Sequence, residues 1–126
     1  MKPFFIIILI SISLLSCIGR DNCNNSLSIV GKYQNIYDKK AKNILIIKSD
    51  GTFEQVFKKD EIIKRNSGTW KFFDKSCKVY FDTLRIFHSL PKSVRKYERN
   101  LGIFRNNNIL FVEGLSYEFD FFRIKD

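Results

Sequence analysis

Short apolar runs separated by turn residues recur from residue 29 to residue 124, and they restrict the fold more than any other feature of the chain. Residues 43–48 and 53–58 are two such runs, rich in Ile, Val and Phe, and Ser49-Asp50-Gly51-Thr52 lies between them. An Asp-Gly pair between two apolar runs is the strongest short-range signal for a β-hairpin. The sequence therefore predicts antiparallel strands joined by tight turns.

The same pattern predicts about eight strands. We expect them at residues 29–37, 43–48, 53–58, 67–73, 78–87, 103–105, 109–113 and 117–124, while residues 58–65 fit either a continuing strand or a loop. Alternation within the runs places Trp70 and Phe72 on a buried face, and Glu118 and Asp120 on a solvent face. This close spacing is typical of an all-β fold, a small antiparallel β-barrel or meander.

Residues 89–102 break the strand pattern. Pro91 lies near the start of this segment and Gly102 just past its end, which is typical of helix boundaries. The sequence predicts one short basic helix near residues 91–100, with apolar side chains on one face and four cations around the rest: Lys92, Arg95, Lys96 and Arg99. These cations are either solvated charges on a helix that caps the barrel, or a patch that binds another envelope protein or an anionic surface.

The first 17 residues have the layout of an export signal. Lys2 provides a positive start, an apolar run follows from Phe4, and Cys17 comes after Ser16. The run is well short of the roughly 20 residues that a transmembrane helix needs. An ordinary cleaved signal would end in small residues of the Ala-x-Ala type, which are absent. Leu14-Leu15-Ser16-Cys17 resembles the lipobox of bacterial lipoproteins, and the resemblance implies that lipid, including palmitate, is attached to Cys17.

This interpretation divides the chain into three parts. Residues 1–16 are a signal peptide, residues 17–28 are the lipidated Cys and a flexible spacer, and residues 29–126 form a single domain. Two or three acyl chains anchor a protein stably, whereas one chain alone binds a membrane only marginally. We therefore expect a protein of the cell envelope, lipid-anchored to a bacterial outer membrane, with its domain outside the cytoplasm.

Two further cysteines, Cys23 and Cys77, remain if Cys17 takes lipid. Thiols outside the cytoplasm tend to pair, so a Cys23–Cys77 disulfide is expected. The alternative is two unpaired thiols, with Cys77 half-buried on a strand. A disulfide between these residues would fasten the spacer to the domain.

The sequence offers little support for catalysis. His88 is the only His, and no Ser, Cys or carboxylate accompanies it in a nucleophile motif. Metal-ligand clusters and phosphate-binding Gly loops are also absent from the sequence, so we expect no enzyme activity, no metal and no cofactor. The formal net charge of +9 fits an acidic partner, but a codon bias toward Lys, Ile, Asn and Phe produces it equally well. Export argues against nucleic acid as a partner.

Three short motifs resemble small bacterial lipocalin-like lipoproteins. They are Gly31-Lys32-Tyr33 in the first expected strand, Asp50-Gly51-Thr52-Phe53 at the hairpin, and Gly68-Thr69-Trp70 in a later strand. The resemblance covers about residues 30–87 and implies a lipocalin-like barrel.

Two functions remain open. The first is a non-catalytic binding module for another envelope protein, and the alternative is a lipocalin-style carrier of a small hydrophobic ligand. A cavity lined by Trp70, Phe72, Phe119 and Phe121 would favour the carrier. The chain has 13 Phe, 5 Tyr and 1 Trp, and only Phe4 and Phe5 precede Cys17. Aromatic side chains in this number are expected to fill a domain of this size, which favours the binding module.

Lipid attachment at Cys17 is the first testable expectation. Cells grown with an alkyne fatty acid should label the protein, and Cys17→Ala should abolish the label because the acceptor thiol is gone. In-gel fluorescence after click coupling measures the result. A Cys17→Ala variant that is labelled as strongly as the wild type would contradict the lipobox interpretation.

Overall fold

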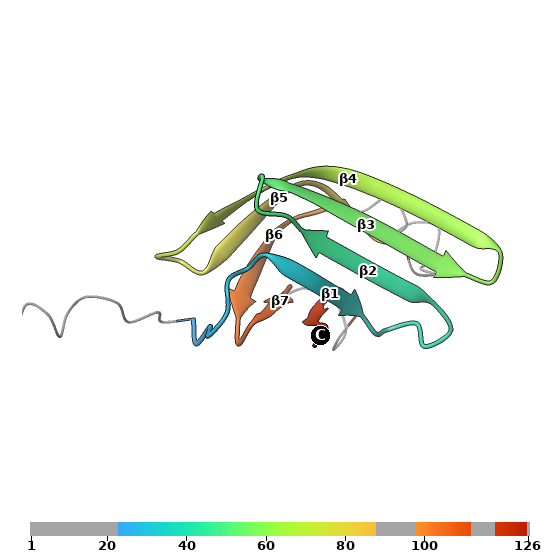
Figure 1. Ribbon diagram of the computed structural model, residues 1–126, viewed down its shortest axis with the longest axis horizontal. Coiled ribbons are helices and arrows are strands. Elements are labelled where there is room, and N and C mark those ends of the chain that lie inside the picture. The colour runs from blue at the N-terminus through green and yellow to red at the C-terminus, as the bar shows by residue number, and fades with distance from the viewer. Residues whose placement is uncertain (1–22, 88–97, 112–117, 126) are drawn as a thin grey trace, which may run out of the picture.

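The computed structural model describes residues 23–87, 98–111 and 118–125, apart from the side chains of residues 98 and 99. In these ranges the protein is all-β, without a helix (Figure 1). The eight strands are β1 (Gly31–Asn35), β2 (Lys42–Ile47), β3 (Thr52–Lys59), β4 (Ile62–Phe73), β5 (Lys78–Arg85), β6 (Glu98–Arg105), β7 (Asn108–Leu110) and β8 (Phe122–Arg123).

The strands form one antiparallel sheet that curls into a nearly closed barrel. Strands β1 to β7 follow one another as a meander, and β8 pairs with β1 through Tyr33↔Arg123 and Gln34↔Phe122. On the other side, Ile109 of β7 and Phe121 exchange two backbone hydrogen bonds of 2.9 and 2.8 Å. Because this bridge joins the two ends of the sheet, the expectation of a small antiparallel barrel of about eight strands is confirmed.

The predicted basic helix is not seen. Residues 98–100 belong to β6, where Arg99 pairs with Leu84 and Glu98 with Arg85 of β5. Leu101, which the helical periodicity places on an apolar face, is 52% exposed on the outside of the barrel. Pairing with β5 overrides that periodicity because it satisfies the backbone groups of these residues across the sheet. Residues 91–97 of the predicted helix lie outside the described residues.

The hairpin predicted at Asp50-Gly51 is present between β2 and β3. Gly51 has a positive φ of 87°, a conformation that a residue without a Cβ adopts at no steric cost. The Asp50 carboxylate accepts hydrogen bonds from the backbone N–H of Thr52 (3.0 Å) and from its hydroxyl (2.5 Å). These two bonds stabilise the charged carboxylate and lower the pKa of Asp50.

Strand β4 is a single strand of 12 residues, so residues 62–65 continue it rather than forming a loop. Its first eight residues pair with β3, from Lys59↔Ile62 to Thr52↔Thr69, and its last four residues pair with β5, from Trp70↔Phe81 to Phe73↔Lys78. Strands β3 and β4, called the β3–β4 ribbon below, therefore extend past β5, while β2 runs beside β3 as far as Lys42↔Lys58 (Figure 1).

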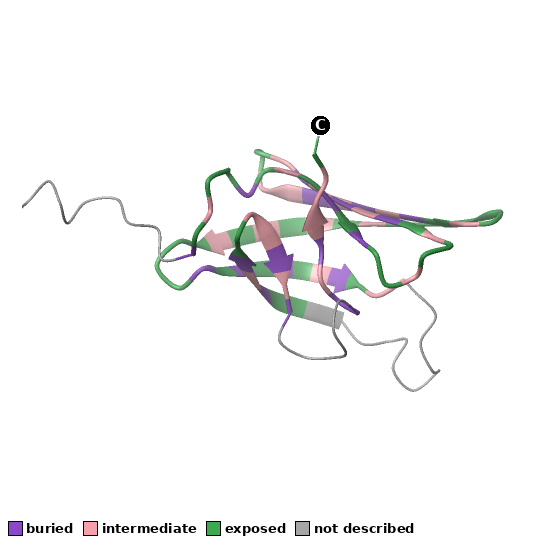
Figure 2. Cartoon of the chain, turned by 90° about the horizontal axis from the view of Figure 1, so that it is seen from below, coloured by how far each residue is buried: buried purple, intermediate pink, exposed green. Residues whose placement is uncertain are grey.

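The core lies between the inward faces of the curled sheet, as the alternation of buried and exposed positions shows (Figure 2). Its largest fully buried side chains are aromatic: Tyr33, Phe53, Phe81 and Phe104. Trp70 and Phe72 pack against this core but are only partly buried. The indole N–H of Trp70 donates to the Lys48 carbonyl (2.9 Å) at the rim of the hairpin.

The expected solvent-facing position of Glu118 is wrong. Glu118 is 8% exposed, and residues 118–120 are not in a strand, so the alternation assumed for them does not hold. Asp120 is partly buried, and its carboxylate accepts from the Phe111 N–H (2.7 Å). A side chain–backbone bond thus replaces strand pairing at this end of the barrel.

Cys23 and Cys77 lie within disulfide-bonding distance, with their Cα atoms 5.8 Å apart, in agreement with the expected pair. The surrounding backbone holds both residues in place, since Asn106 N–H donates to Cys23 O (3.1 Å) and Phe104 N–H donates to Cys77 O (2.8 Å). The link ties the described N-terminal end to the β4–β5 turn.

Removal of the Cys23–Cys77 link should destabilise the domain. The bond closes a loop with a sequence separation of 54, and in the chain-entropy model a loop of this size contributes on the order of 4 kcal/mol. The double variant Cys23→Ala/Cys77→Ala should lose about this much in urea unfolding, and reductant should bring the wild type to the same midpoint. Two alkylatable thiols in the unreduced protein, measured by intact mass, would contradict this.

Candidate functional site

Most of the site residues predicted from the sequence lie outside the described residues. Cys17, Lys92, Arg95 and Lys96 lie outside the described residues, and so does His88. Arg99 belongs to β6, but its side chain is not among those described. The basic patch expected in this region thus remains a prediction.

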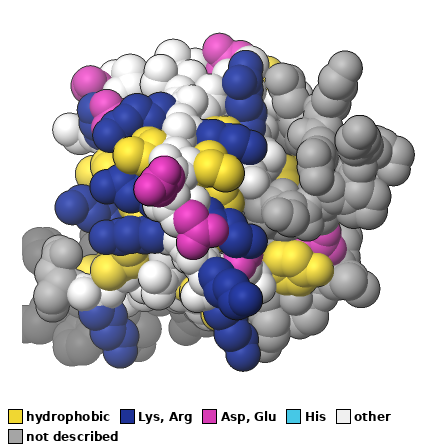
Figure 3. Space-filling model, turned by 90° about the vertical axis from the view of Figure 1, so that its right-hand side faces the viewer, with side chains coloured by type: hydrophobic (Ala, Val, Ile, Leu, Met, Phe, Trp, Pro, Cys, Tyr) yellow, Lys and Arg dark blue, Asp and Glu magenta, His cyan; other side chains and the backbone are white. Residues whose placement is uncertain are grey.

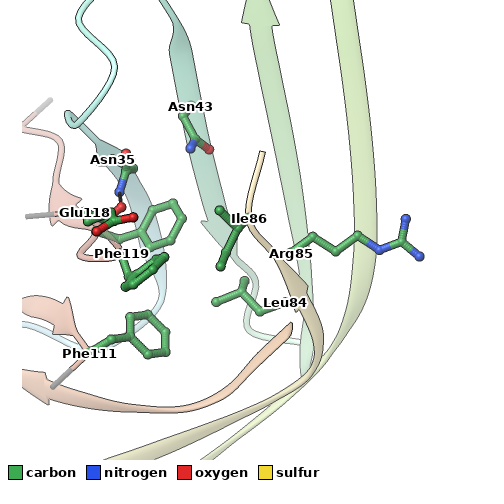
Figure 4. A pocket seen from close by; sticks show the side chains of 9 residues that line it. Asn35, Asn43, Leu84, Arg85, Ile86, Phe111, Glu118 and Phe119 are labelled. Carbon is green, nitrogen blue, oxygen red and sulfur yellow. Dashed lines mark hydrogen bonds between the residues drawn. The ribbon is translucent and has the colours of Figure 1, made fainter. Parts of the chain in front are cut away.

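One pocket lies inside the barrel, at the end where β1 and β2 meet β5 (Figure 4). Its lining includes apolar and polar side chains: Asn35, Asn43, Leu84, Arg85, Ile86, Phe111, Glu118, Phe119 and Phe121. Phe119 and Phe121 are two of the four residues expected to line a carrier cavity, whereas Trp70 and Phe72 are not part of this pocket.

This pocket is small. The centres of water-sized molecules have about 10 Å³ available to them, which is close to the minimum for one buried water. Asn43 Oδ1 is buried there without a hydrogen-bond partner among the described residues, and Asn35 Nδ2 donates to the carbonyls of Glu118 (2.9 Å) and Asp120 (3.0 Å). The pocket therefore has the size and the acceptor that suit a single water molecule rather than a lipid chain.

A second buried polar cluster lies where β5 separates from β4. Gln55, only 1% exposed, donates to the Arg85 carbonyl (2.9 Å) and accepts from the Arg85 N–H (2.9 Å). Asn66 Nδ2 donates to Gln55 Oε1 (2.7 Å) and to the Thr83 carbonyl (2.7 Å). These side-chain amides take the place of strand pairing, because Thr83 has a positive φ of 63° and the β5–β6 register shifts between Tyr80 and Leu84.

The free end of the β3–β4 ribbon carries the most exposed aliphatic side chains of the described structure. Ile62 and Ile63 are 54% and 56% exposed, and they face Lys59 and Lys58 across the ribbon. Exposed Lys64 and Arg65 follow them in β4. Figure 3 shows this end of the molecule, where hydrophobic side chains lie among Lys and Arg side chains.

Sequence reasoning does not single out this pair of isoleucines as a site. In the sequence, Ile62-Ile63 is an apolar pair inside a charged segment that fits a strand or a loop. Neighbouring isoleucines point to opposite faces of a strand, so both are exposed only where neither face of the ribbon is covered. That condition depends on the position of β5, which the local sequence does not reveal.

The described residues offer no recognisable catalytic or metal site. Groups of three or more His, Cys, Asp or Glu side chains that could hold a metal ion do not occur among them. Glu118 and Asp120 interact with the protein itself, as their hydrogen bonds and burial indicate. In the same part of the chain, no helix is long and apolar enough to cross a membrane.

Comparison with protein-family models, with curated proteins and with solved structures gives no match. The function must therefore be inferred from the geometry of the chain itself.

Arg123 closes the barrel next to β1. Its guanidinium lies over the Tyr33 ring, 4.8 Å from the ring centroid, and donates to the Tyr33 hydroxyl (2.7 Å). It also donates to the carbonyls of Ser28, Val30 (3.3 Å) and Asn107 (3.3 Å). The Tyr33 hydroxyl donates in turn to the Ile29 carbonyl (2.5 Å). Burial raises the pKa of Tyr33 to about 12, although the neighbouring Arg123 charge acts in the opposite direction.

The raised pKa of Tyr33 predicts a loss of stability at alkaline pH. Because the unfolded phenol ionises near pH 10 and the folded one near pH 12, the protonated phenol stabilises the fold below pH 10. This contribution, on the order of 2–3 kcal/mol, is lost as the pH rises from 10 to 12. Urea unfolding of wild type and Tyr33→Phe across this range measures it as a difference. A constant difference between the two proteins from pH 9 to pH 12 would contradict the prediction.

Proposed function

We propose that this protein is a lipid-anchored, non-catalytic binding module of the cell envelope that acts on another envelope protein. The main observation behind the proposal is the filled interior. Among the described residues, aromatic and aliphatic side chains occupy the space between the sheet faces, and the pocket at Asn43 and Glu118 has room for about one water. A barrel whose described interior has no room for a ligand is expected to act through its surface.

The carrier alternative has less support. A carrier of a small hydrophobic molecule needs a pocket of about 300–1,000 Å³ that encloses most of the ligand. The volume open to water-sized molecules in the pocket at Asn43 and Glu118 is about 10 Å³, far below that range. The pocket would also place buried polar atoms against any ligand. Polar groups without partners would disfavour an apolar guest.

The predicted anchor agrees with action at the surface. Cys17 precedes Cys23 by a few residues, and Cys23 is tied to the β4–β5 turn. The β3–β4 hairpin lies at the other end of β4, away from the described N-terminal end (Figure 1). A strand of this length spans roughly 40 Å. Lipid at Cys17 would therefore leave the hairpin end directed away from the membrane that holds the anchor.

Purification of the tagged protein from envelopes solubilised in mild detergent tests the proposal. We expect a complex with one other protein at fixed stoichiometry, identified by native mass spectrometry after cross-linking in intact cells. Cross-linking of a lipoprotein with an unrelated domain, expressed with the same residues 1–22, serves as the control for proximity in the membrane. A stoichiometric fatty acid or other apolar molecule in the organic extract, without a protein complex, would contradict the proposal and favour a carrier.

A further inference from the structure

The outer edge of β4 is an unpaired strand edge in the described structure. Strand β5 pairs with β4 only from Trp70 onward, and no described strand pairs with this edge between Ile62 and Thr69. The Asp82 carbonyl of β5 lies next to Gly68, and the Asn66 side chain donates to the Thr83 carbonyl, so β5 is still close to the edge at these residues. The accessible part of the edge is therefore Ile62–Arg65.

The register of the ribbon tells which backbone groups point outward. The Trp70 N–H donates to the Gly51 carbonyl (2.9 Å), and the register with β3 continues without a shift to Ile62. In an antiparallel pair, alternate residues direct both backbone groups to the same partner. Even-numbered residues of β4 therefore face β3, whereas Ile63 and Arg65 direct their N–H and C=O groups away from it.

The side chains around this edge combine apolar surface with positive charge. Ile62 and Ile63 are more than half exposed on opposite faces of the ribbon. Lys58, Lys64 and Arg65 are exposed next to them, while Asp60 and Glu61 are confined to the turn. An exposed edge strand with apolar side chains is a template for pairing with another chain, and proteins protect such edges where pairing is not wanted.

We propose that the edge Ile62–Arg65 binds an extended, acidic segment of another protein, which adds to the sheet as a further strand beside β4. This proposal rests on the proposed function and names the surface that performs it. Backbone bonds to Ile63 and Arg65 would supply affinity, and carboxylates of the segment would face the surrounding Lys and Arg side chains.

The charge of the edge is what favours an acidic segment over a second copy of this chain. Antiparallel pairing of two copies would bring two sets of Lys58, Lys64 and Arg65 together, in a protein with a formal net charge of +9. Like charges that face each other across a strand pair are destabilising. An acidic segment converts the same charges into attraction.

Binding of a short fluorescein-labelled peptide of alternating Val and Glu to the full mature protein tests the edge directly. Ile63→Pro removes one outward N–H without a change in charge, and an edge strand tolerates Pro at such a position. We expect it to weaken binding about tenfold or more in fluorescence anisotropy. Ile63→Thr keeps the N–H and is the matched control, and we expect it to lose less affinity for the peptide than Ile63→Pro does. Circular dichroism of both variants verifies that they fold.

Charge reversal separates the local effect from net charge. Lys64→Glu/Arg65→Glu should abolish peptide binding. Lys71→Glu/Lys75→Glu makes the same change in charge near the other end of β4 and in the β4–β5 turn, and it should leave most of the binding. Binding by the wild type should weaken steeply as salt rises, because exposed charges are screened within about 8 Å at physiological salt. A peptide of alternating Val and Lys should not bind.

Hydrogen exchange locates the bound segment. The amides of Ile63 and Arg65 should exchange about tenfold more slowly with the Val-Glu peptide present, since each would donate to the added strand. Unchanged exchange at both amides, or equal binding by Ile63→Pro and wild type, would overturn the edge proposal. So would concentration-dependent dimers or binding to anionic vesicles that Ile63→Pro abolishes, because each assigns the edge a different occupant.

The envelope complex distinguishes the two proposals. If that complex forms with wild type and is lost with Ile63→Pro but not with Ile63→Thr, both proposals are supported. If it survives Ile63→Pro, the edge proposal is wrong while the binding function stands. If no complex forms and an apolar molecule is extracted instead, the binding function itself is wrong.

Discussion

Closure of the sheet next to β1 is the constraint on which the rest of the structure depends. Strand β8 has only two residues, Phe122 and Arg123, so its backbone pairing with β1 contributes little stability on its own. Arg123 compensates with its side chain, which covers the Tyr33 ring and donates to carbonyls just before β1 and in the β6–β7 turn. The Ile109–Phe121 bridge completes the ring. With the sheet closed, the aromatic side chains of opposite strands meet and exclude solvent from the interior.

The β3–β4 ribbon, in contrast, has an open edge because β5 pairs with β4 only at Trp70–Phe73. Thr83 has a positive φ, and the side-chain amides of Gln55 and Asn66 bind the β5 backbone where its pairing with β4 has ended. The first residues of β4 thereby lose their second neighbour, and Ile62 and Ile63 become exposed on both faces. A buried polar network of this kind requires that each amide be satisfied, because an unpaired buried amide costs on the order of 1–3 kcal/mol. The same network that supports the core thus creates the surface to which we assign binding.

Local signals predicted the elements that depend on local chemistry. The Asp50-Gly51 hairpin and the strands on either side of it follow from turn propensity and from the apolar runs that flank the turn. The predicted helix near residues 91–100 was wrong for residues 98–100, because their sequence also fits a strand paired with β5. The predicted exposure of Glu118 was wrong because strand alternation was assumed for residues 118–120, which are not in a strand. Asp120, for example, accepts the Phe111 N–H through its side chain.

By itself the sequence determined the all-β class, the approximate number of strands and the hairpin partners, because adjacent apolar runs joined by tight turns pair with each other. It also singled out Cys23 and Cys77, which the fold brings within disulfide-bonding distance. Only the tertiary structure decided the contact between the Arg123 guanidinium and Tyr33, the burial of Glu118 and the exposed edge of β4. Each of these depends on residues far apart in the chain, and no local propensity or periodicity carries information about contacts of that kind.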